Sequence, residues 1–258
     1  MHHAHIDKFA YQDSIIHRLD SRVKFIVTVL FTAVVISLPR TSVSILFCYA
    51  VGPFAVLVLA GIPLRFVFKH ILIVSPFVVV LAFSSVFYDR SIVRIAFGPF
   101  LWEVTAGWLR CFSILGKFII TMMALIALVS TTRFGNLLCG LQKLGFPKIL
   151  VIQLGFLYRY IFILIDRAHH IIRARIGRKL RNLGLRKEMK VASSMIGSLL
   201  GRSIDTAQRV NIAMEGRGFN GNWHSLSRLR VRKADLIFIF SAAAFTAGLF
   251  IFVKPILG

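Results

Sequence analysis

The stretch from Asp166 to Phe219 reads DRAHHIIRARIGRKLRNLGLRKEMKVASSMIGSLLGRSIDTAQRVNIAMEGRGF, and it decides how the rest of the chain is arranged. The stretch is strongly basic, is predicted to be helical, and is too polar to lie inside a bilayer. Apolar segments surround it on both sides. A membrane protein with its densest charge between spans exposes that charge to the aqueous phase. We therefore interpret the stretch as a cytoplasmic docking surface for a soluble partner.

The composition of the whole chain indicates an integral membrane protein. Hydrophobic residues make up 57% of the 258 residues, and the mean hydropathy is +0.77, whereas soluble domains are about 45–50% apolar. The formal net charge of +22 suits nucleic acid, an anionic membrane surface or an acidic protein. The hydrophobicity argues against nucleic acid, so we expect membrane lipids and other proteins as partners.

Residue types that often bind metals form no strong pattern. The three cysteines lie far apart, mostly in apolar surroundings, with neither metal-ligand nor disulfide spacing: Cys48, Cys111 and Cys139. The N-terminal histidines form only a weak candidate metal site, whose role stays open: His2, His3 and His5. We assign no metal ligands and no catalytic residues. Residues 1–22 are polar and show no signal-peptide pattern, so we expect the first apolar run to be retained and to act as its own signal.

Five apolar segments are predicted to cross the membrane: 23–38, 43–60, 71–87, 111–130 and 235–253. Residues 88–110 are expected to form an external loop or a short re-entrant piece. Basic residues before the first span favour a cytoplasmic N-terminus. Lys117 lies inside the fourth span, and we expect its side chain to snorkel to the interface.

The apolar segments 134–144 and 149–165 create a conflict in the topology. The second segment is long enough to cross the membrane, but crossing would place the basic stretch outside. Residues 131–234 contain 20 of the 32 lysines and arginines and only four acidic residues. Because cytoplasmic loops carry the excess of basic residues, we expect both segments to lie at the cytoplasmic face. A tight hairpin through the membrane is the alternative.

The chain is therefore predicted to have three parts. Residues 1–130 hold the N-terminal segment and four spans. Residues 131–234 form the cytoplasmic region, and residues 235–258 form the last span.

Two long helices are predicted in the cytoplasmic region. The first runs from Pro147 to about Arg181 and is ended by Asn182-Leu183-Gly184. The second runs from about Lys187 to Glu215 and is ended by glycines, namely Gly216, Gly218 and Gly221. Small residues recur every four positions on the second helix, at Ser193, Gly197 and Gly201. Because small residues allow close approach, we expect the helices to cross near Gly197.

Three segments resemble a known family. They are IDKFAYQDSIIHRLDSRVKF at 6–25, LLCGLQKLGFPKILVIQLGFLYRYIFILIDRAHHIIRARIGRK at 137–179, and AMEGRGF at 213–219. They resemble the transmembrane T components of energy-coupling factor (ECF) transporters, particularly the cobalt/nickel CbiQ type. The resemblance covers the chain from Ile6 to about Gly221.

The resemblance implies an all-α, L-shaped membrane protein with about five transmembrane helices and two long cytoplasmic coupling helices. Each coupling helix ends near a short motif centred on arginine, often Ala-Arg-Gly, and this arginine engages an ATPase subunit. The second motif is Gly216-Arg217-Gly218, with Gly216 where alanine is usual. The first is best placed at Gly177-Arg178-Lys179, which departs from Ala-Arg-Gly on both sides, so Arg175 and Arg181 stay open as alternatives.

The resemblance also implies partners and a location. The partners are two cytoplasmic P-loop ATPase subunits (CbiO-like) and a membrane substrate-binding S component (CbiM-like, with a CbiN-like protein as a further candidate). The location is a bacterial or archaeal inner membrane. The chain has no G-x-x-x-x-G-K-[ST] motif, so ATP and Mg²⁺ are expected to be used by the partners, with no cofactor on this chain.

The function implied is energy coupling in an ATP-driven importer of cobalt or nickel ions. A membrane enzyme acting on a lipid or prenyl substrate is an alternative, which would need clustered acids or histidines near the interface. A self-sufficient permease would need ionisable groups at mid-membrane, and Lys117 alone gives little support for that. The simplest reading of the remaining basic residues is a coat against anionic lipid.

Overall fold

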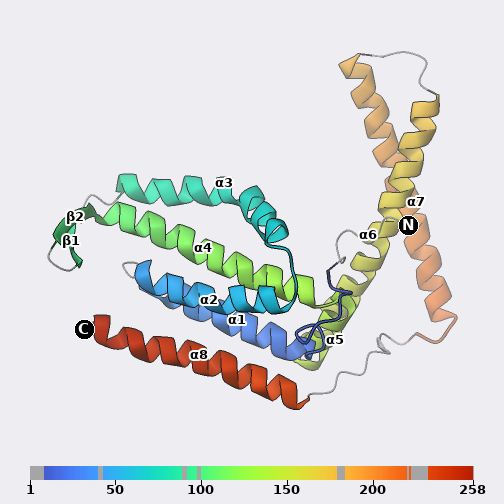
Figure 1. Cartoon of the computed structure of the whole chain (residues 1–258). Helices are drawn as coiled ribbons and strands as arrows, with labels where there is room; N and C mark the ends of the chain where they lie inside the picture. The colour runs from blue at the N-terminus through green and yellow to red at the C-terminus, as the bar shows by residue number, and fades with distance from the viewer. Residues whose placement is uncertain are drawn as a thin grey trace. The chain divides into compact units, whose positions relative to one another are not determined.

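The computed structural model describes residues 9–39, 43–88, 92–97, 100–178, 184–219, 221 and 232–257. The chain folds as two compact units: unit 1 comprises Met1–Gly140 and Arg228–Gly258, and unit 2 comprises Leu141–Ser227. The described residues form eight helices and one hairpin (Figure 1). The helices are α1 (Ser21–Ser37), α2 (Val43–Leu59), α3 (Leu64–Tyr88), α4 (Ala106–Thr131), α5 (Phe134–Lys143), α6 (Lys148–Gly177), α7 (Leu185–Glu215) and α8 (Lys233–Leu257).

The predicted all-α fold class is confirmed, with one local exception. The exception is an antiparallel hairpin of β1 (Ile92–Phe97) and β2 (Phe100–Thr105), in which Ile92 pairs with Thr105 and Phe97 with Phe100. It lies between α3 and α4, where an external loop or a re-entrant piece was expected. The reason is that this segment is rich in β-branched and aromatic residues, which favour strands.

The centre of unit 1 is α4, which packs against α1, α2 and α3, while α8 packs against α1 and α2. Figure 1 shows these helices as a layer of roughly aligned rods. Twelve residues of α4 are buried, because it has neighbours on several sides. In contrast, α3 turns many large apolar side chains outward, among them Phe68, Leu72, Phe77 and Val80. An outer face of this kind suits contact with lipid.

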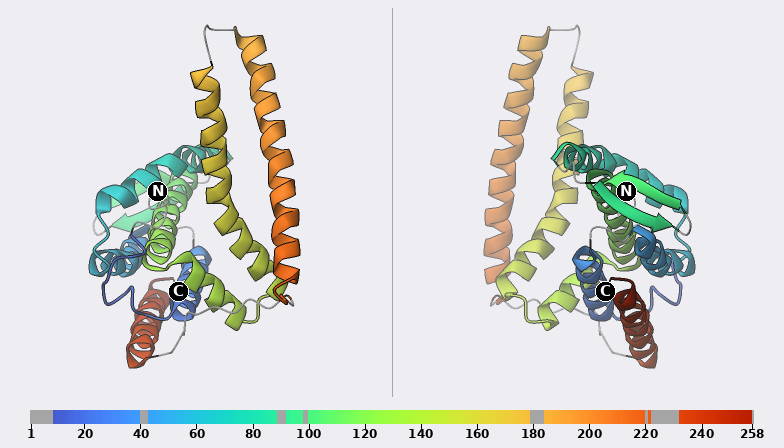
Figure 2. Two further views of the ribbon diagram at one scale, coloured as in Figure 1. Left: turned by 90° about the vertical axis from the view of Figure 1, so that its right-hand side faces the viewer. Right: turned by 90° about the vertical axis from the view of Figure 1, so that its left-hand side faces the viewer.

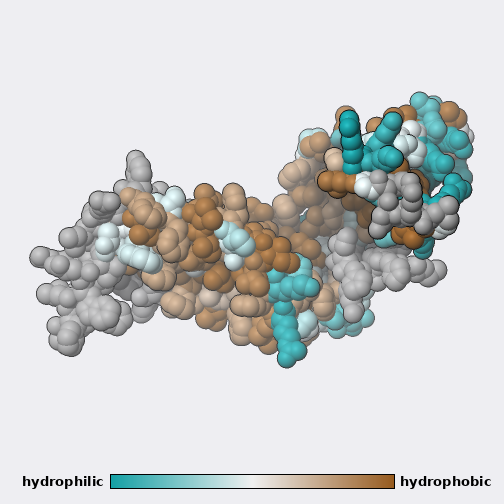
Figure 3. All heavy atoms as spheres, turned by 90° about the horizontal axis from the view of Figure 1, so that it is seen from above, coloured by the Kyte–Doolittle hydropathy of each residue, from teal (hydrophilic) through white to brown (hydrophobic). Residues whose placement is uncertain are grey.

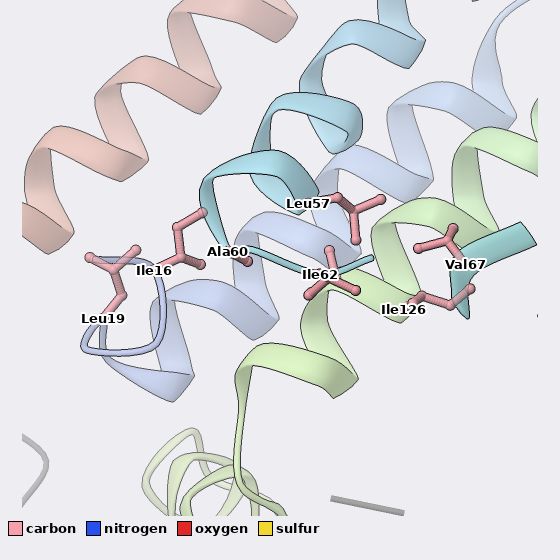
Figure 4. Close-up of a cluster of buried hydrophobic side chains, with 8 residues drawn as sticks. Ile16, Leu19, Leu57, Ala60, Ile62, Val67 and Ile126 are labelled. Atoms are coloured by element: carbon pink, nitrogen blue, oxygen red, sulfur yellow. The ribbon is translucent and has the colours of Figure 1, made fainter. Parts of the chain in front are cut away.

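Two apolar clusters form the core of unit 1. One lies between the N-terminal segment, the α2–α3 connection and α4, and includes Ile16, Leu19, Leu57, Ala60, Ile62, Val67 and Ile126 (Figure 4). The other joins α1, α2 and α4 through Val35, Leu38, Ile45, Leu46, Tyr49 and Ile120. Ile16 and Leu19 of the first cluster lie before α1, in a segment without regular helix. The N-terminal segment is therefore part of the core and not a loose extension.

Aromatic contacts fix the N-terminal segment further. The rings of Phe9 and Phe66 lie 4.8 Å apart, and the guanidinium of Arg133 lies 4.5 Å from the centre of the Tyr11 ring. The second contact is a cation–π interaction, which contributes about 0.5–1 kcal/mol at exposed sites. These contacts tie the segment to α3 and to the turn between α4 and α5.

Two lysines link α1 and α4 reciprocally. Lys24, near the start of α1, donates to the carbonyl oxygen of Thr131 at the end of α4, at 2.8 Å. Lys117 of α4 donates to the carbonyl oxygens of Leu38 (2.6 Å) and Ile36 (3.0 Å) at the end of α1. Each lysine thus satisfies carbonyls that a helix end leaves without an intrahelical partner. Lys117 is therefore engaged by carbonyls at the end of α1, and its predicted reach to the membrane interface stays a prediction.

Three helices of the described residues are long and apolar enough to cross a membrane: α3, α4 and α6. The described part of α2 forms a shorter apolar helix at Ile45–Leu59. The prediction of five spans shares α3 and α4 with this set, counts α1, α2 and α8 as well, and leaves out α6. The first half of α6 is apolar, which explains why it qualifies by composition. The side of the membrane, and the L shape implied by the resemblance, stay predictions.

Unit 2 contains the two predicted long helices. Its first helix, α6, runs from Lys148 to Gly177, and its second, α7, from Leu185 to Glu215. The expected bounds were about 147–181 and 187–215, so both helices are confirmed to within a turn. The residues expected to end the first helix, Asn182 and Leu183, lie outside the described part of the chain. Figure 2 shows α6 and α7 as two long helices side by side.

Candidate functional site

The end of α7 holds the predicted Gly216-Arg217-Gly218 motif in a defined turn. The amide of Phe219 donates to the carbonyl oxygen of Met214 (3.0 Å), and that of Gly218 to the carbonyl oxygen of Glu215 (2.9 Å). This pair of bonds is the Schellman pattern that closes many helices. Gly218 has a φ of +75°, which L-residues other than glycine adopt at a cost of about 1–2 kcal/mol. The motif therefore needs glycine after the arginine.

Arg217 is exposed within this turn, whereas Phe219 is half-buried. The amide of Arg217 donates to the carbonyl oxygen of Met214, at 3.1 Å. Phe219 and Met214 both line a cavity of about 430 Å³ between α6 and α7. An apolar contact between these two positions usually accompanies the Schellman pattern. The turn is thus fixed by backbone bonds and by Phe219, and it presents a guanidinium to the outside at a helix C-terminus, where a cation is favoured.

The end of α6 presents a second exposed arginine. Arg178 lies directly after the last helical residue, and its amide donates to the carbonyl oxygen of Arg175, at 3.0 Å. Arg178 and Gly177 are both exposed. Lys179 and Arg181 lie outside the described residues. The structure thus describes two of the three candidate arginines for the first motif.

Arg175, the other described candidate, is engaged inside unit 2. Its guanidinium forms an ion pair with the carboxylate of Glu188, which joins α6 to α7, and each side chain is about a quarter exposed, at 27%. Binding a partner through Arg175 would require breaking this pair. Arg178 lies exposed at the helix end, and binding a partner through Arg178 does not require the Arg175–Glu188 pair to break.

A second contact joins the middle of α6 to α7. Nη1 of Arg167 donates to Oγ1 of Thr206 at 2.6 Å and lies 3.5 Å from the carbonyl oxygen of Arg202. The cavity beside this contact is lined by apolar and aromatic side chains of both helices, including Phe156, Tyr160, Ile163, Leu164, Val210 and Met214. The contacts that join the two helices therefore include the ion pair of Arg175 with Glu188, the hydrogen bonds of Arg167 and a set of apolar side chains.

The small residues of α7 do not take part in these contacts. A Cβ atom added at Gly197 or Gly201 would meet no heavy atom within 4 Å, and the hydroxyl of Ser193 donates to the carbonyl oxygen of Lys190 in its own helix. The described contacts with α6 lie on either side of these small residues, at Glu188 and at Thr206. The structure thus leaves the small-residue face open, and its role in close packing stays a prediction.

The surface of α7 carries both charge and apolar side chains. None of its residues, all of which the structure describes, is buried. Its large exposed apolar side chains are Leu185, Met189, Ile196, Leu200, Ile204 and Ile212. In Figure 3, hydrophilic side chains gather on unit 2, while hydrophobic ones dominate the visible face of the unit 1 helices. A helix without a buried face is typical of an element that binds a partner.

Metal ligands do not cluster in the part of the chain that the structure describes: no group of three or more His, Cys, Asp or Glu residues could hold a metal ion there. His2, His3 and His5 lie outside that part.

Sequence reasoning overlooked a set of buried polar residues in unit 1. Asp20, Ser21, Lys24 and Asp235 are all buried, although in the sequence these positions indicate only the edges of spans. The available signal was the position of Lys24 and Asp235, two charges at the margins of apolar segments. A buried charge needs a partner. The sequence therefore indicates that Lys24 and Asp235 each have a partner, but it does not show which residue that is.

Comparison with known proteins agrees with these observations. The family profile described as "Cobalt transport protein" (CbiQ) matches residues 12–228. The chain is 25% identical over 226 residues to the energy-coupling factor transporter transmembrane protein EcfT of Bacillus selenitireducens, which covers 84% of each chain. It is 32% identical over 127 residues to the cobalt transport protein CbiQ of Rhodobacter capsulatus (47% of this chain, 50% of that one).

A third relative is an uncharacterised protein of Methanocaldococcus jannaschii, 28% identical over 127 residues (49% of this chain, 44% of that one). The chain thus spans about half the length of two of these three relatives.

Proposed function

Because the chain belongs to the CbiQ family of cobalt transport proteins, we propose that it is the transmembrane energy-coupling subunit of an ATP-driven importer of ECF type. The ion proposed is cobalt, with nickel as the alternative. In this proposal two soluble P-loop ATPase subunits bind unit 2 on the cytoplasmic side, and a membrane subunit supplies the ion-binding site. The chain itself transmits motion and catalyses no reaction.

The observation that carries the proposal is the exposed Arg217 in a fixed turn at the end of α7. A guanidinium offers five donors in a rigid fork, which suits bidentate bonds to carboxylates or helix-end carbonyls. A coupling joint needs such a directional contact, because a contact that slides passes on little motion. The backbone hydrogen bonds of Gly218 and Phe219 fix the backbone on either side of Arg217. The side chain of Arg217 therefore extends from a fixed backbone position.

The first docking motif is proposed at Arg178. Its exposure at the end of α6 supports this choice, and the ion pair of Arg175 with Glu188 speaks against Arg175. Arg181 stays an alternative. In the proposal, each of Arg178 and Arg217 engages one ATPase subunit.

Motion is proposed to pass through α6 and α7 as a joined pair. When the ATPase subunits close on ATP, the two helix ends are displaced together. The bonds between Arg167 and Thr206 and between Arg175 and Glu188 oppose sliding of one helix along the other. The exposed apolar face of α7 is proposed to pass this displacement to the ion-binding membrane subunit.

The proposal is tested by ion uptake in the assembled transporter. The chain is reconstituted with its ATPase and ion-binding subunits, and ATP-dependent uptake of radioactive cobalt is measured for Arg217→Glu. A lost arginine contact at an interface costs roughly 2–4 kcal/mol, so uptake should fall at least tenfold. Arg209→Glu is the matched control, since Arg209 is also exposed on α7, and it should keep at least half of the uptake. Equal uptake by the wild type and Arg217→Glu would refute the docking role.

A further inference from the structure

Three residues at the start of α1, Asp20, Ser21 and Lys24, bind three different elements of unit 1. The amide of Asp20 donates to Oδ1 of Asp235 in α8 (2.7 Å). The hydroxyl of Ser21 donates to the carbonyl oxygen of Asn136 in α5 (2.8 Å). Nζ of Lys24 donates to the carbonyl oxygen of Thr131 at the end of α4 (2.8 Å). We call Asp20, Ser21 and Lys24 the α1 anchor.

The α1 anchor is buried, and it brings charges of opposite sign together. Asp235 is only 1% exposed, and its second oxygen accepts from the amide of Arg232 (2.6 Å). The ammonium of Lys24 interacts electrostatically with the carboxylates of Asp235 and Asp20. Removing one member of such a buried set leaves the others without compensation, which is strongly unfavourable. The set therefore holds its elements in one arrangement.

The partners of the α1 anchor are the points where the chain leaves and rejoins unit 1. The chain leaves after α4 through α5, and unit 2 begins at Leu141. It rejoins unit 1 at Arg228, shortly before α8 starts at Lys233. A single turn of α1 thus binds the outgoing chain at two places and the returning chain at one.

The contact with α5 is close enough to be sensitive to one methyl group. A Cβ atom at Gly140 would lie 2.9 Å from Oγ of Ser21 and 3.4 Å from the backbone nitrogen of Arg22. Any side chain at position 140 would therefore force Ser21 or α5 to shift. Gly135, one and a half turns earlier in the same helix, has no heavy atom within 4 Å of such a Cβ atom. The two glycines of α5 form a natural matched pair.

We propose that the α1 anchor is a positioning element for energy coupling, because it fixes both connections between unit 2 and the membrane-spanning helices. Displacement of α6 and α7 can act on the spans only through connections that resist it. Asp20, Ser21 and Lys24 act through α4, α5 and α8 and need no contact with ATP, ion or ATPase subunits. This inference rests on the proposed function of the chain as a coupling subunit.

The test compares Gly140→Leu with Gly135→Leu in the reconstituted transporter, measuring cobalt uptake and ATP hydrolysis in the same vesicles. Leucine suits a helix at both positions, so only the contact with α1 differs. For Gly140→Leu we expect binding of the ATPase subunits within twofold of the wild type and at least a tenfold loss of ions imported per ATP. For Gly135→Leu we expect that ratio to stay within twofold. An unchanged ratio in Gly140→Leu would overturn the inference.

A milder variant decides the matter if Gly140→Leu fails to accumulate in the membrane. Ser21→Ala keeps the size of the residue and removes only the hydroxyl that binds Asn136, and it should lower the ratio of ions to ATP about threefold at an unchanged membrane level. A wild-type ratio in Ser21→Ala would then overturn the inference. If the proposed function itself is wrong, the wild type shows no ATP-dependent uptake and Arg217→Glu has no effect. If only the inference fails, the wild type still shows ATP-dependent uptake and Arg217→Glu still lowers it, while the ratio of ions to ATP in the α1 anchor variants stays at the wild-type value.

Discussion

Arg217 owes its position to the residues on either side of it. Gly218 supplies the left-handed conformation, and Phe219 anchors the turn in the cavity between α6 and α7. Each residue of the pattern Gly-Arg-Gly-Phe therefore has a physical role. Gly216 ends the helix and Arg217 exposes a cation, while Gly218 makes the turn and Phe219 packs against apolar side chains. The same reasoning separates the candidates for the first motif, because Arg175 is paired with Glu188 whereas Arg178 is exposed at the helix end.

At the scale of single residues, the left-handed conformation of Gly218 leads to a testable prediction. Gly218→Ala forces an alanine into the left-handed region, which costs about 1–2 kcal/mol. If the ATPase subunit binds Arg217 in this turn, the affinity for that subunit should fall about five- to thirtyfold. Binding is measured by titrating the ATPase subunit onto the chain in nanodiscs. Gly201→Ala is the control, because Gly201 is helical with open space around it, and it should change the affinity less than twofold. An unaltered affinity in Gly218→Ala would show that the turn is not used for binding.

At the scale of elements, α1 and α4 are tied together at both ends by lysines. Lys24 binds the last turn of α4, and Lys117 binds the last carbonyls of α1. Such bonds matter in a bilayer, where no water is present to satisfy a free carbonyl. Sequence periodicity cannot reveal them, because a lysine inside an apolar helix looks the same whether it snorkels to the interface or caps a neighbouring helix.

Lys117→Met tests this reciprocal link. Methionine is about as long as lysine and keeps an apolar stem, but it leaves the carbonyl oxygens of Leu38 and Ile36 without their donor. A hydrogen bond to a charged group contributes about 1.5–3 kcal/mol, so we expect the unfolding free energy in detergent to fall by about 2 kcal/mol. Denaturant unfolding of the purified chain measures it. Lys69→Met, which removes an exposed lysine of α3, should leave the value within about 0.5 kcal/mol. An equal loss in both variants would contradict the link.

The elements most visible in the sequence were those with a long, uniform pattern. The bounds of α6 and α7 followed from Pro147, from the charge run and from the glycines at 184, 216 and 218. The hairpin between α3 and α4 was missed because apolar runs near a membrane were assigned to spans or loops by default. The α1 anchor was missed because its bonds join residues 115 and 215 positions apart. Sequence spacing carries no information about such pairs.

At the scale of the whole molecule, the two units differ in composition and in the side chains that they expose. Unit 1 supplies the lipid-facing helices and the buried anchor, and unit 2 supplies two long helices with exposed arginines at their ends. The excess of basic residues in 131–234 predicts a cytoplasmic location for unit 2 by the positive-inside rule. This assignment of sides is a prediction from charge, and it agrees with a docking role for Arg178 and Arg217.

The most direct test is the affinity of the ATPase subunits for the chain carrying both Arg178→Glu and Arg217→Glu. The chain is held in nanodiscs, and the dissociation constant is measured by titration with the purified ATPase pair. Each lost arginine contact costs roughly 2 kcal/mol or more, so we predict at least a hundredfold weaker binding, with membrane insertion and thermal stability unchanged. A dissociation constant within threefold of the wild-type value would contradict the claim that these two arginines connect the chain to its ATPase subunits.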